Sequence, residues 1–289
     1  MDKYLNSIEL AYSLGYILSG FIIFIIGKIA YKQLHPNINI QQELVEKDNF
    51  AFILSYVGFF AALTIAIGGT IVGESYDFIT DIQHIFIYGI SATFLLLLAA
   101  WISNKVILHK FDLKKEIIVD KNEGSGIIEA AIFIANGVIL YGALVGESET
   151  LLQGITTFVV YWFIGNIVLI IASKIFISWM SYDIHEAIEK DNVAAGVSFS
   201  GAIIAIGIIT MNAIIDPFVD WTSTLVNISI QTVLGCILLP IMRVFADKIL
   251  LPGQKLTDEI VNQEKPNIGA GLIEAFAYIA SAILITWSI

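Results

Sequence analysis

The sequence of 289 residues is poor in charge. Only 14% of its residues are charged, against roughly 25% in an average soluble domain, and 57% are hydrophobic. A soluble chain of this length would need more polar surface to cover its core. The mean hydropathy of +0.82 excludes a disordered chain and an ordinary soluble enzyme. It is typical of a protein that crosses a bilayer several times.

Cysteine and basic residues are also scarce. The single Cys236 lies in an apolar run, which excludes a disulfide framework. The 15 Lys and Arg residues are outnumbered by 26 Asp and Glu residues, and the net charge is −11. Because nucleic-acid binding calls for a basic surface, we expect no nucleic-acid partner. No metal-ligand spacing, phosphate-binding loop, dinucleotide fingerprint or nucleophile motif occurs, so we expect no metal, no cofactor and no enzymatic activity.

Long apolar runs dominate what is present. A membrane-spanning helix needs about 20 mainly apolar residues, and eight segments meet this condition. Backbone groups in lipid must be paired internally, and the continuous runs do not fit the alternating strands of a β-barrel. We therefore expect an all-α polytopic membrane protein. The predicted spans are Tyr12–Tyr31, Phe50–Gly73, Ile82–Ser103, Gly126–Gly146, Leu151–Ser173, Val193–Ile215, Ser223–Phe245 and Ile268–Ser288.

Basic residues are unevenly distributed over the connections. Of the 15 Lys and Arg residues, all but Lys3 lie in or beside the first, third, fifth and seventh connections. The even-numbered connections contain acidic residues but no Lys or Arg. Because cytoplasmic loops are enriched in basic residues, we expect the odd connections in the cytoplasm. Both termini are then outside it, in a bacterial inner membrane.

The chain repeats itself. Glu43–Asn49 recurs as Glu186–Asn192 at an offset of 143, and Gly124–Ala130 recurs as Gly269–Ala275 at an offset of 145. These matches predict two four-span repeats, 1–146 and 147–289. An even number of spans gives both repeats the same orientation. We therefore expect parallel repeats related by a pseudo-two-fold axis along the membrane normal.

The repeated motifs carry a resemblance. Glu-Lys-Asp-Asn is followed by a span rich in Ala, Ser and Gly, and Gly-x-Gly-x-x-Glu opens a later span. This pattern resembles the YjfL-type bacterial membrane family, a domain of unknown function that occurs as one four-helix unit or as a tandem pair. The resemblance covers both halves and implies no settled activity. Some members are encoded near phage-shock-type membrane-remodelling proteins and aminopropyltransferase-like enzymes, so the resemblance implies a role in envelope or polyamine physiology.

Two spans carry stripes of small residues at helical spacing. Each stripe begins with an aspartate, Asp48 or Asp191, which is followed by Asn49 or Asn192. Small residues let helices approach closely in lipid, so the stripes are interpreted as packing seams in which the aspartates cap the helices. The alternative is a polar path headed by each aspartate. The stripe residues are Ala51, Ser55, Gly58 and Ala62 in the second span and Ala194, Ser198, Gly201 and Ala205 in the sixth.

Two glutamates occupy equivalent places in the fourth and eighth spans. Glu129 and Glu274 each lie about one turn inside the cytoplasmic boundary. Carboxylates within spans usually face the bundle interior and mark ion or proton pathways. A glutamate so near the boundary can also reach headgroup water or complement its own helix N-terminus. If these spans line the repeat interface, the two carboxylates face each other across the pseudo-axis.

Two functions from different classes fit these features. The first is a cation- or proton-linked transporter or channel, in which Asp48, Glu129, Asp191 and Glu274 bind a small cation and Asn49 and Asn192 support them. The second is a scaffold in the lipid bilayer whose cytoplasmic segments dock a protein of envelope stress or membrane remodelling. Residues 111–119 and 184–188 alternate apolar and charged residues, which favours short helices on the membrane surface or a partner contact. The sequence leaves the oligomeric state open.

Overall fold

The structure is a computed structural model. It describes residues 7–73, 75–145, 150–216, 218–251 and 253–288, which fold into helices and short connections. Eight of the helices are long and apolar enough to cross a membrane, as the sequence predicts. They are α1 (Ser7–Leu34), α2 (Phe50–Val72), α3 (Phe78–Val106), α5 (Glu123–Val145), α6 (Leu151–Trp179), α8 (Val193–Ile214), α9 (Trp221–Phe245) and α11 (Ile268–Ser288).

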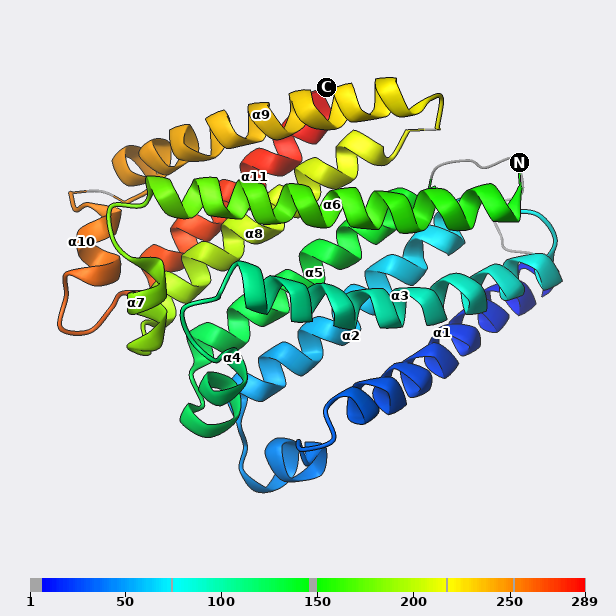
Figure 1. Ribbon diagram of the computed structural model, residues 1–289, viewed down its shortest axis with the longest axis horizontal. Helices are drawn as coiled ribbons and strands as arrows, with labels where there is room; N and C mark the ends of the chain where they lie inside the picture. Colours follow the sequence, from blue (N-terminus) through cyan, green and yellow to red (C-terminus); the bar gives the residue numbers. More distant parts are fainter. Residues whose placement is uncertain (1–6, 74, 146–149, 217, 252, 289) are drawn as a thin grey trace.

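The eight long helices form two layers (Figure 1). One layer contains α1, α3, α6 and α9, and the other contains α2, α5, α8 and α11. Helices within a layer run parallel, and the two layers run in opposite directions. The chain therefore alternates between the layers, and each pair of consecutive long helices forms an antiparallel hairpin. Since α8 lies between α5 and α11, it is the most deeply buried of the eight spans.

Small residues hold the layer of α2, α5, α8 and α11 together. A Cβ atom on Gly137 of α5 would lie 2.6 Å from the Cα atom of Ala62 in α2. A Cβ atom on Gly207 of α8 would lie 2.8 Å from the Cα atom of Ala135 in α5. Backbones this close gain van der Waals contact, which drives helix association in lipid. The stripe residue Gly58 packs in the same way on Ala130 of α5.

The two repeats are arranged differently from the expected pseudo-two-fold. A two-fold axis makes an interface isologous, so a contact between α5 and α8 would require an equal contact between their equivalents, α11 and α2. Here α5 of the first repeat packs along α8 of the second, but no comparable contact between α2 and α11 occurs among the described residues. The contact between repeats instead resembles the α2–α5 and α8–α11 contacts within them. The expectation of a two-fold was wrong because span order fixes the direction of each helix but not its neighbour.

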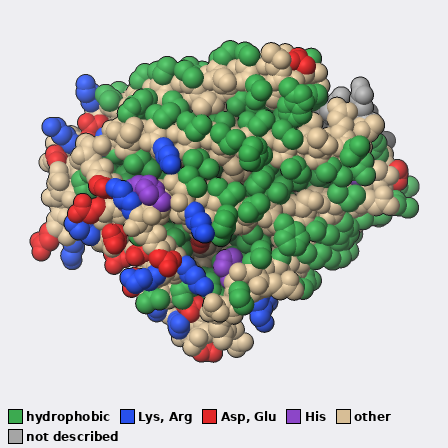
Figure 2. Space-filling view, viewed as in Figure 1, with side chains coloured by type: hydrophobic (Ala, Val, Ile, Leu, Met, Phe, Trp, Pro, Cys, Tyr) green, Lys and Arg blue, Asp and Glu red, His purple; other side chains and the backbone are tan. Residues whose placement is uncertain are grey.

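Four connections gather at one end of the bundle. We call this end the charged end, and it comprises residues 35–49, 107–122, 180–192 and 246–267. Charged side chains cluster there on the face shown in Figure 2, while the rest of this face is mainly hydrophobic or uncharged, with a few acidic side chains at its far edges. The short helices at this end are η1 (Gln42–Glu46), α4 (Leu113–Lys115), η2 (Glu116–Asp120), α7 (Ile184–Glu189), η3 (Ala246–Leu250) and α10 (Leu256–Val261).

The segments 111–119 and 184–188 do form short helices, but protein rather than the membrane surface covers their apolar side. Leu113 and Ile117 of the first segment are buried, as are Ile184 and Ile188 of the second. Their periodicity matches a surface helix and a helix packed on the bundle end equally well.

Candidate functional site

Glu129 lies on α5 where that helix meets α2 and α3. Its carboxylate accepts a hydrogen bond of 2.5 Å from the Ser55 hydroxyl and one of 3.0 Å from Nδ2 of Asn104. The carboxylate is partly buried, and within the described residues no Lys, Arg or His nitrogen lies within 4.0 Å of it. Ser55 and Asn104 therefore hold Glu129 in place while leaving its charge without a counterion.

Glu129 lines a pocket of about 280 Å³ beside the charged end. Aromatic rings form much of the wall, namely Tyr31, Phe52, Trp101 and Phe133. The pocket is large enough for several waters or a small organic molecule, since one water occupies roughly 30 Å³ in the liquid. The structure thus combines a carboxylate, apolar walls and open space, all within the first repeat.

Glu274 has the same place in the second repeat but different partners. Its Oε1 atom accepts hydrogen bonds of 2.6 Å from Nε of Arg243 and from the Tyr278 hydroxyl. A second guanidinium nitrogen donates to the Thr257 hydroxyl at 2.9 Å. The Glu274 side chain is 0% exposed and that of Arg243 is 19% exposed, so this is a buried ion pair. Glu274 is therefore neutralised by the protein itself.

The two glutamates do not face each other. The side-chain partners of Glu129 lie on α2 and α3 of the first repeat, and those of Glu274 lie on α9 and α11 of the second. Although α5 lines the interface between repeats, α11 lies on the far side of α8. The condition for a shared site is not met, and each repeat has its own.

The second site also adjoins a pocket, of about 260 Å³. Nine of its ten lining residues stand at positions equivalent to residues that line the first pocket, at offsets of 143 or 145. Arg243 takes the place of Ala100, and Thr257 takes the place of Lys114. The chain therefore contains one pocket twice, and a guanidinium group lines only the second copy.

The aspartates at the head of the two stripes lie outside the helices. Asp48 and Asp191 are exposed and have positive φ angles of 46° and 58°. The residues that cap α2 and α8 are Asn49 and Asn192, whose side chains accept hydrogen bonds from backbone N–H groups of the first turn. The expectation that the aspartates cap these helices was wrong by one residue. The left-handed turn directs them into solvent, away from the stripes.

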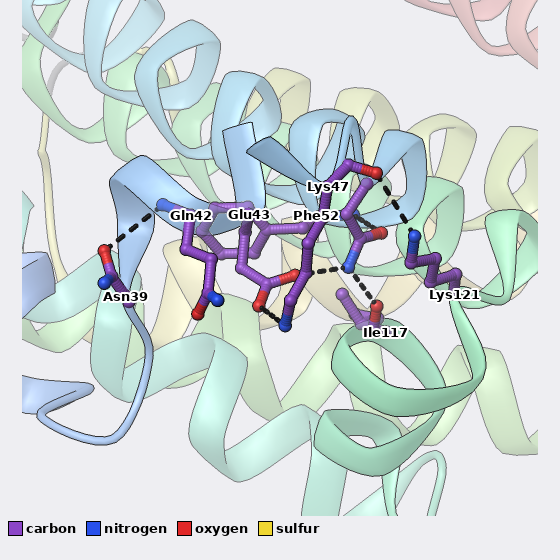
Figure 3. Close-up of polar contacts among 8 residues, drawn as sticks. Asn39, Gln42, Glu43, Lys47, Phe52, Ile117 and Lys121 are labelled. Atoms are coloured by element: carbon purple, nitrogen blue, oxygen red, sulfur yellow. Dashed lines mark hydrogen bonds and ion pairs between the residues drawn. The ribbon is translucent and has the colours of Figure 1, made fainter. Parts of the chain in front are cut away.

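The capping asparagines also join neighbouring units. Asn49 donates to Oε2 of Glu43 in its own connection and to the carbonyl of Ile117 in the next, both at 2.9 Å (Figure 3). Asn122, which caps α5, donates to Glu116 and to the Ile188 carbonyl of the second repeat at 2.6 Å. Asn49 and Asn192 were expected to support a cation, but their amides are occupied by these structural bonds. Asn192 makes the same kind of contact, since it donates to the Ile260 carbonyl of the next connection at 2.8 Å.

Two glutamates bonded to these asparagines differ electrostatically. Burial acts to raise the pKa of Glu43, but hydrogen bonds from Lys47 and Asn49 outweigh it and hold the pKa below its ordinary value. Burial raises the pKa of Glu116, and the hydrogen bond from Asn122 offsets this only in part. The difference follows from sequence, because the position four residues on is Lys47 in one connection and Asp120 in the other.

Several residues of the two sites were missed by sequence reasoning. Arg243 is one of the basic residues beside the seventh connection, and it lies within the predicted span Ser223–Phe245. Aligning the repeats places Ala100 at its position, and this difference could have marked it. Asn122 follows Glu116 by six residues, as Asn49 follows Glu43, so a shorter repeat of one hairpin is also visible in the sequence.

The fold and the duplicated pocket define the class of protein: an integral membrane protein of two tandem four-span repeats. The chain belongs to the family described as Domain of Unknown Function (DUF350), whose profile matches residues 5–144 and again residues 150–289. This confirms the resemblance to a tandem membrane family of unknown function. The chain is also 24% identical over 273 residues to a UPF0719 transmembrane protein of Aquifex aeolicus (strain VF5), covering 92% of this chain and 98% of that protein. No solved structure matches the chain.

Proposed function

We propose that this protein binds a small cation at Glu129 and links that binding to transport across a bacterial inner membrane. One observation carries the proposal: Glu129 borders an open pocket with hydrogen-bond partners but no basic counterion among the described residues, whereas its equivalent Glu274 has Arg243. A carboxylate kept inside a membrane bundle is costly and marks ion pathways in other membrane proteins. The second repeat, whose carboxylate already has Arg243 as its counterion, then serves as a counterpart that stabilises the assembly.

The orientation is part of the proposal. The charged end faces the cytoplasm, because basic residues concentrate in its four connections. The Glu129 pocket opens near this end, so the cation enters from the cytoplasm or leaves to it. A cysteine introduced at position 289 should react with an impermeant label only from outside the cell. Labelling from the cytoplasmic side alone would reverse the direction.

The central test is flux in proteoliposomes that contain the purified protein. The panel should include monovalent cations, divalent cations and organic amines, each measured with and without a pH gradient. Glu129→Gln should abolish cation-dependent flux while the protein remains folded. Gln has the same shape, its amide oxygen can accept the bond from Asn104 and its amide N–H can donate to the Ser55 hydroxyl, but it carries no charge. Glu123→Gln is the matched control, since it changes an exposed carboxylate on the same helix and should leave flux unchanged. If wild-type protein moves none of these cations, the scaffold function gains instead.

A further inference from the structure

The second pocket shows which kind of cation the first one fits. In the second repeat the guanidinium of Arg243 bonds Glu274 at 2.6 Å and Thr257 at 2.9 Å, from a helix position equivalent to Ala100. In the first repeat Ala100 has no functional group, yet the equivalent carboxylate and the surrounding pocket are retained. We propose that the Glu129 pocket binds a small organic cation of the guanidinium class, in the place that the Arg243 side chain takes in the second repeat. This inference rests on the proposed cation site and names its ligand.

The polar atoms of the first pocket suit a ligand with several N–H donors. Glu129 accepts one hydrogen bond from Ser55 and one from Asn104, and a carboxylate has about four acceptor sites. The Oδ1 atom of Asn104 is buried and, within the described part of the chain, has no hydrogen-bond partner. A guanidinium has five N–H donors in a planar fork. It can therefore donate two parallel hydrogen bonds to the remaining acceptor sites of Glu129, which a single-point donor cannot do as well.

The walls of the pocket favour an organic cation over a metal ion. Metal ions such as Ca²⁺ are held by six to eight oxygen ligands, and the described residues contain no group of acidic, His or Cys side chains that could hold a metal. The rings of Tyr31, Trp101 and Phe133 line the pocket instead. Aromatic faces attract organic cations and are most effective where water is excluded. A planar guanidinium can also stack on such rings.

Lys114 lines this pocket, so its ammonium group is a candidate to compete with a cationic ligand for Glu129. It lines the pocket from the charged end, its side chain is exposed, and it makes no ion pair with Glu129. Its equivalent Thr257 bonds the guanidinium of Arg243. A ligand in the first pocket would thus meet a positive charge at the mouth, which favours a small cation with one charged group. Removing Lys114 should strengthen binding rather than abolish it.

The test is binding of ethylguanidinium to the purified protein in detergent. Binding is measured by calorimetry and by the intrinsic tryptophan fluorescence, to which Trp101 in the pocket wall contributes. Wild-type protein should bind one equivalent, and ethylammonium should bind at least tenfold more weakly because it lacks the planar fork. Ala100→Arg should fill the pocket with its own guanidinium and abolish binding while preserving the fold. Glu129→Gln should weaken binding at least tenfold, and Lys114→Ala should strengthen it. Glu123→Gln is the matched control, because it changes an exposed carboxylate on the same helix as Glu129, and it should bind normally.

The outcomes separate this inference from the proposed function. Ethylguanidinium binding that survives Ala100→Arg, or no binding by wild-type protein at concentrations well below denaturing ones, would overturn the inference. If flux of a metal cation nevertheless depends on Glu129, the transport proposal stands with a different ligand. If ethylguanidinium binds as expected but no cation crosses the membrane, the site is a ligand sensor and the transport proposal fails.

Discussion

The buried ion pair of the second repeat gives the sharpest prediction about stability. Arg243→Ala would leave the fully buried Glu274 with the Tyr278 hydroxyl as a partner, and its Oε2 atom already has none in the described structure. Removing one partner of a buried pair costs about 3–5 kcal/mol, because the other charge is left uncompensated. We expect a loss in this range at neutral pH.

The reverse change should cost less. Glu274→Gln would leave an arginine that is 19% exposed, still bonded to Thr257 and next to a pocket that water can enter. A neutral Gln oxygen can also keep part of the bonding, so we expect a loss of about 1–3 kcal/mol. The double variant should lose less than the sum of the two, with a coupling of about 1–3 kcal/mol.

The assay is equilibrium unfolding in mixed micelles, with helix content followed by circular dichroism as the fraction of denaturing detergent rises. Ala100→Arg is the matched control, because it adds the same side chain beside Glu129 and should leave stability equal or increase it. A loss below about 1 kcal/mol for Arg243→Ala, together with additive single variants, would refute the reasoning. The ion pair would then be solvated through the adjoining pocket rather than buried.

Three further predictions concern the helix contacts and the charged end. Gly137→Ala should destabilise the protein by about 1–3 kcal/mol in the same assay, because its Cβ would lie 2.6 Å from the α2 backbone; Gly20→Ala, with open space around it, should be neutral or mildly stabilising. Asn122→Ala should cost more than the usual cap loss of about 0.5–2 kcal/mol, since it also breaks the bond between repeats, whereas Asn267→Ala at the exposed last cap should stay within that range. Burial raises the folded-state pKa of Glu116, so its effect on stability is absent at low pH and becomes unfavourable as pH rises through that pKa. Glu116→Gln should therefore raise the thermal midpoint at pH 7 and not near pH 4, and equal midpoints at both pH values would contradict this.

The eight spans could be predicted because their signal is local. An apolar run of about 20 residues has few alternatives in a membrane chain, and flanking polar residues place its ends within about two turns of the helix ends in the structure. The stripes of small residues also predicted close packing, and Gly58 does meet another helix backbone. What the stripes could not specify was the partner. Both faces of α5 carry small residues, so sequence alone could not order α5 and α8 side by side.

The site was harder to predict because its properties depend on differences between the repeats. Similarity identified Glu129 and Glu274 and suggested that they act as a pair. The contacts separate them, since Arg243 neutralises one while the other adjoins an open pocket. The cap position was missed for a related reason. Asp48 and Asn49 are both good caps, and only the left-handed turn at Asp48 decides between them.

The two ends of the helix layer explain why it contains four helices. Within the layer, α8 presents Gly196 and Gly207 to α5, and these small residues permit backbone contact. At the equivalent positions α2 has Ile53 and Thr64, and among the described residues α2 packs along no helix of its own layer other than α5. At the other end, Trp287 of α11 is 80% exposed where the equivalent position of α5 is a glycine. In arrays of repeats the outer faces of terminal units must suit the solvent and not another unit. Here the solvent is lipid, so bulky apolar side chains end the array by keeping a fifth backbone at a distance.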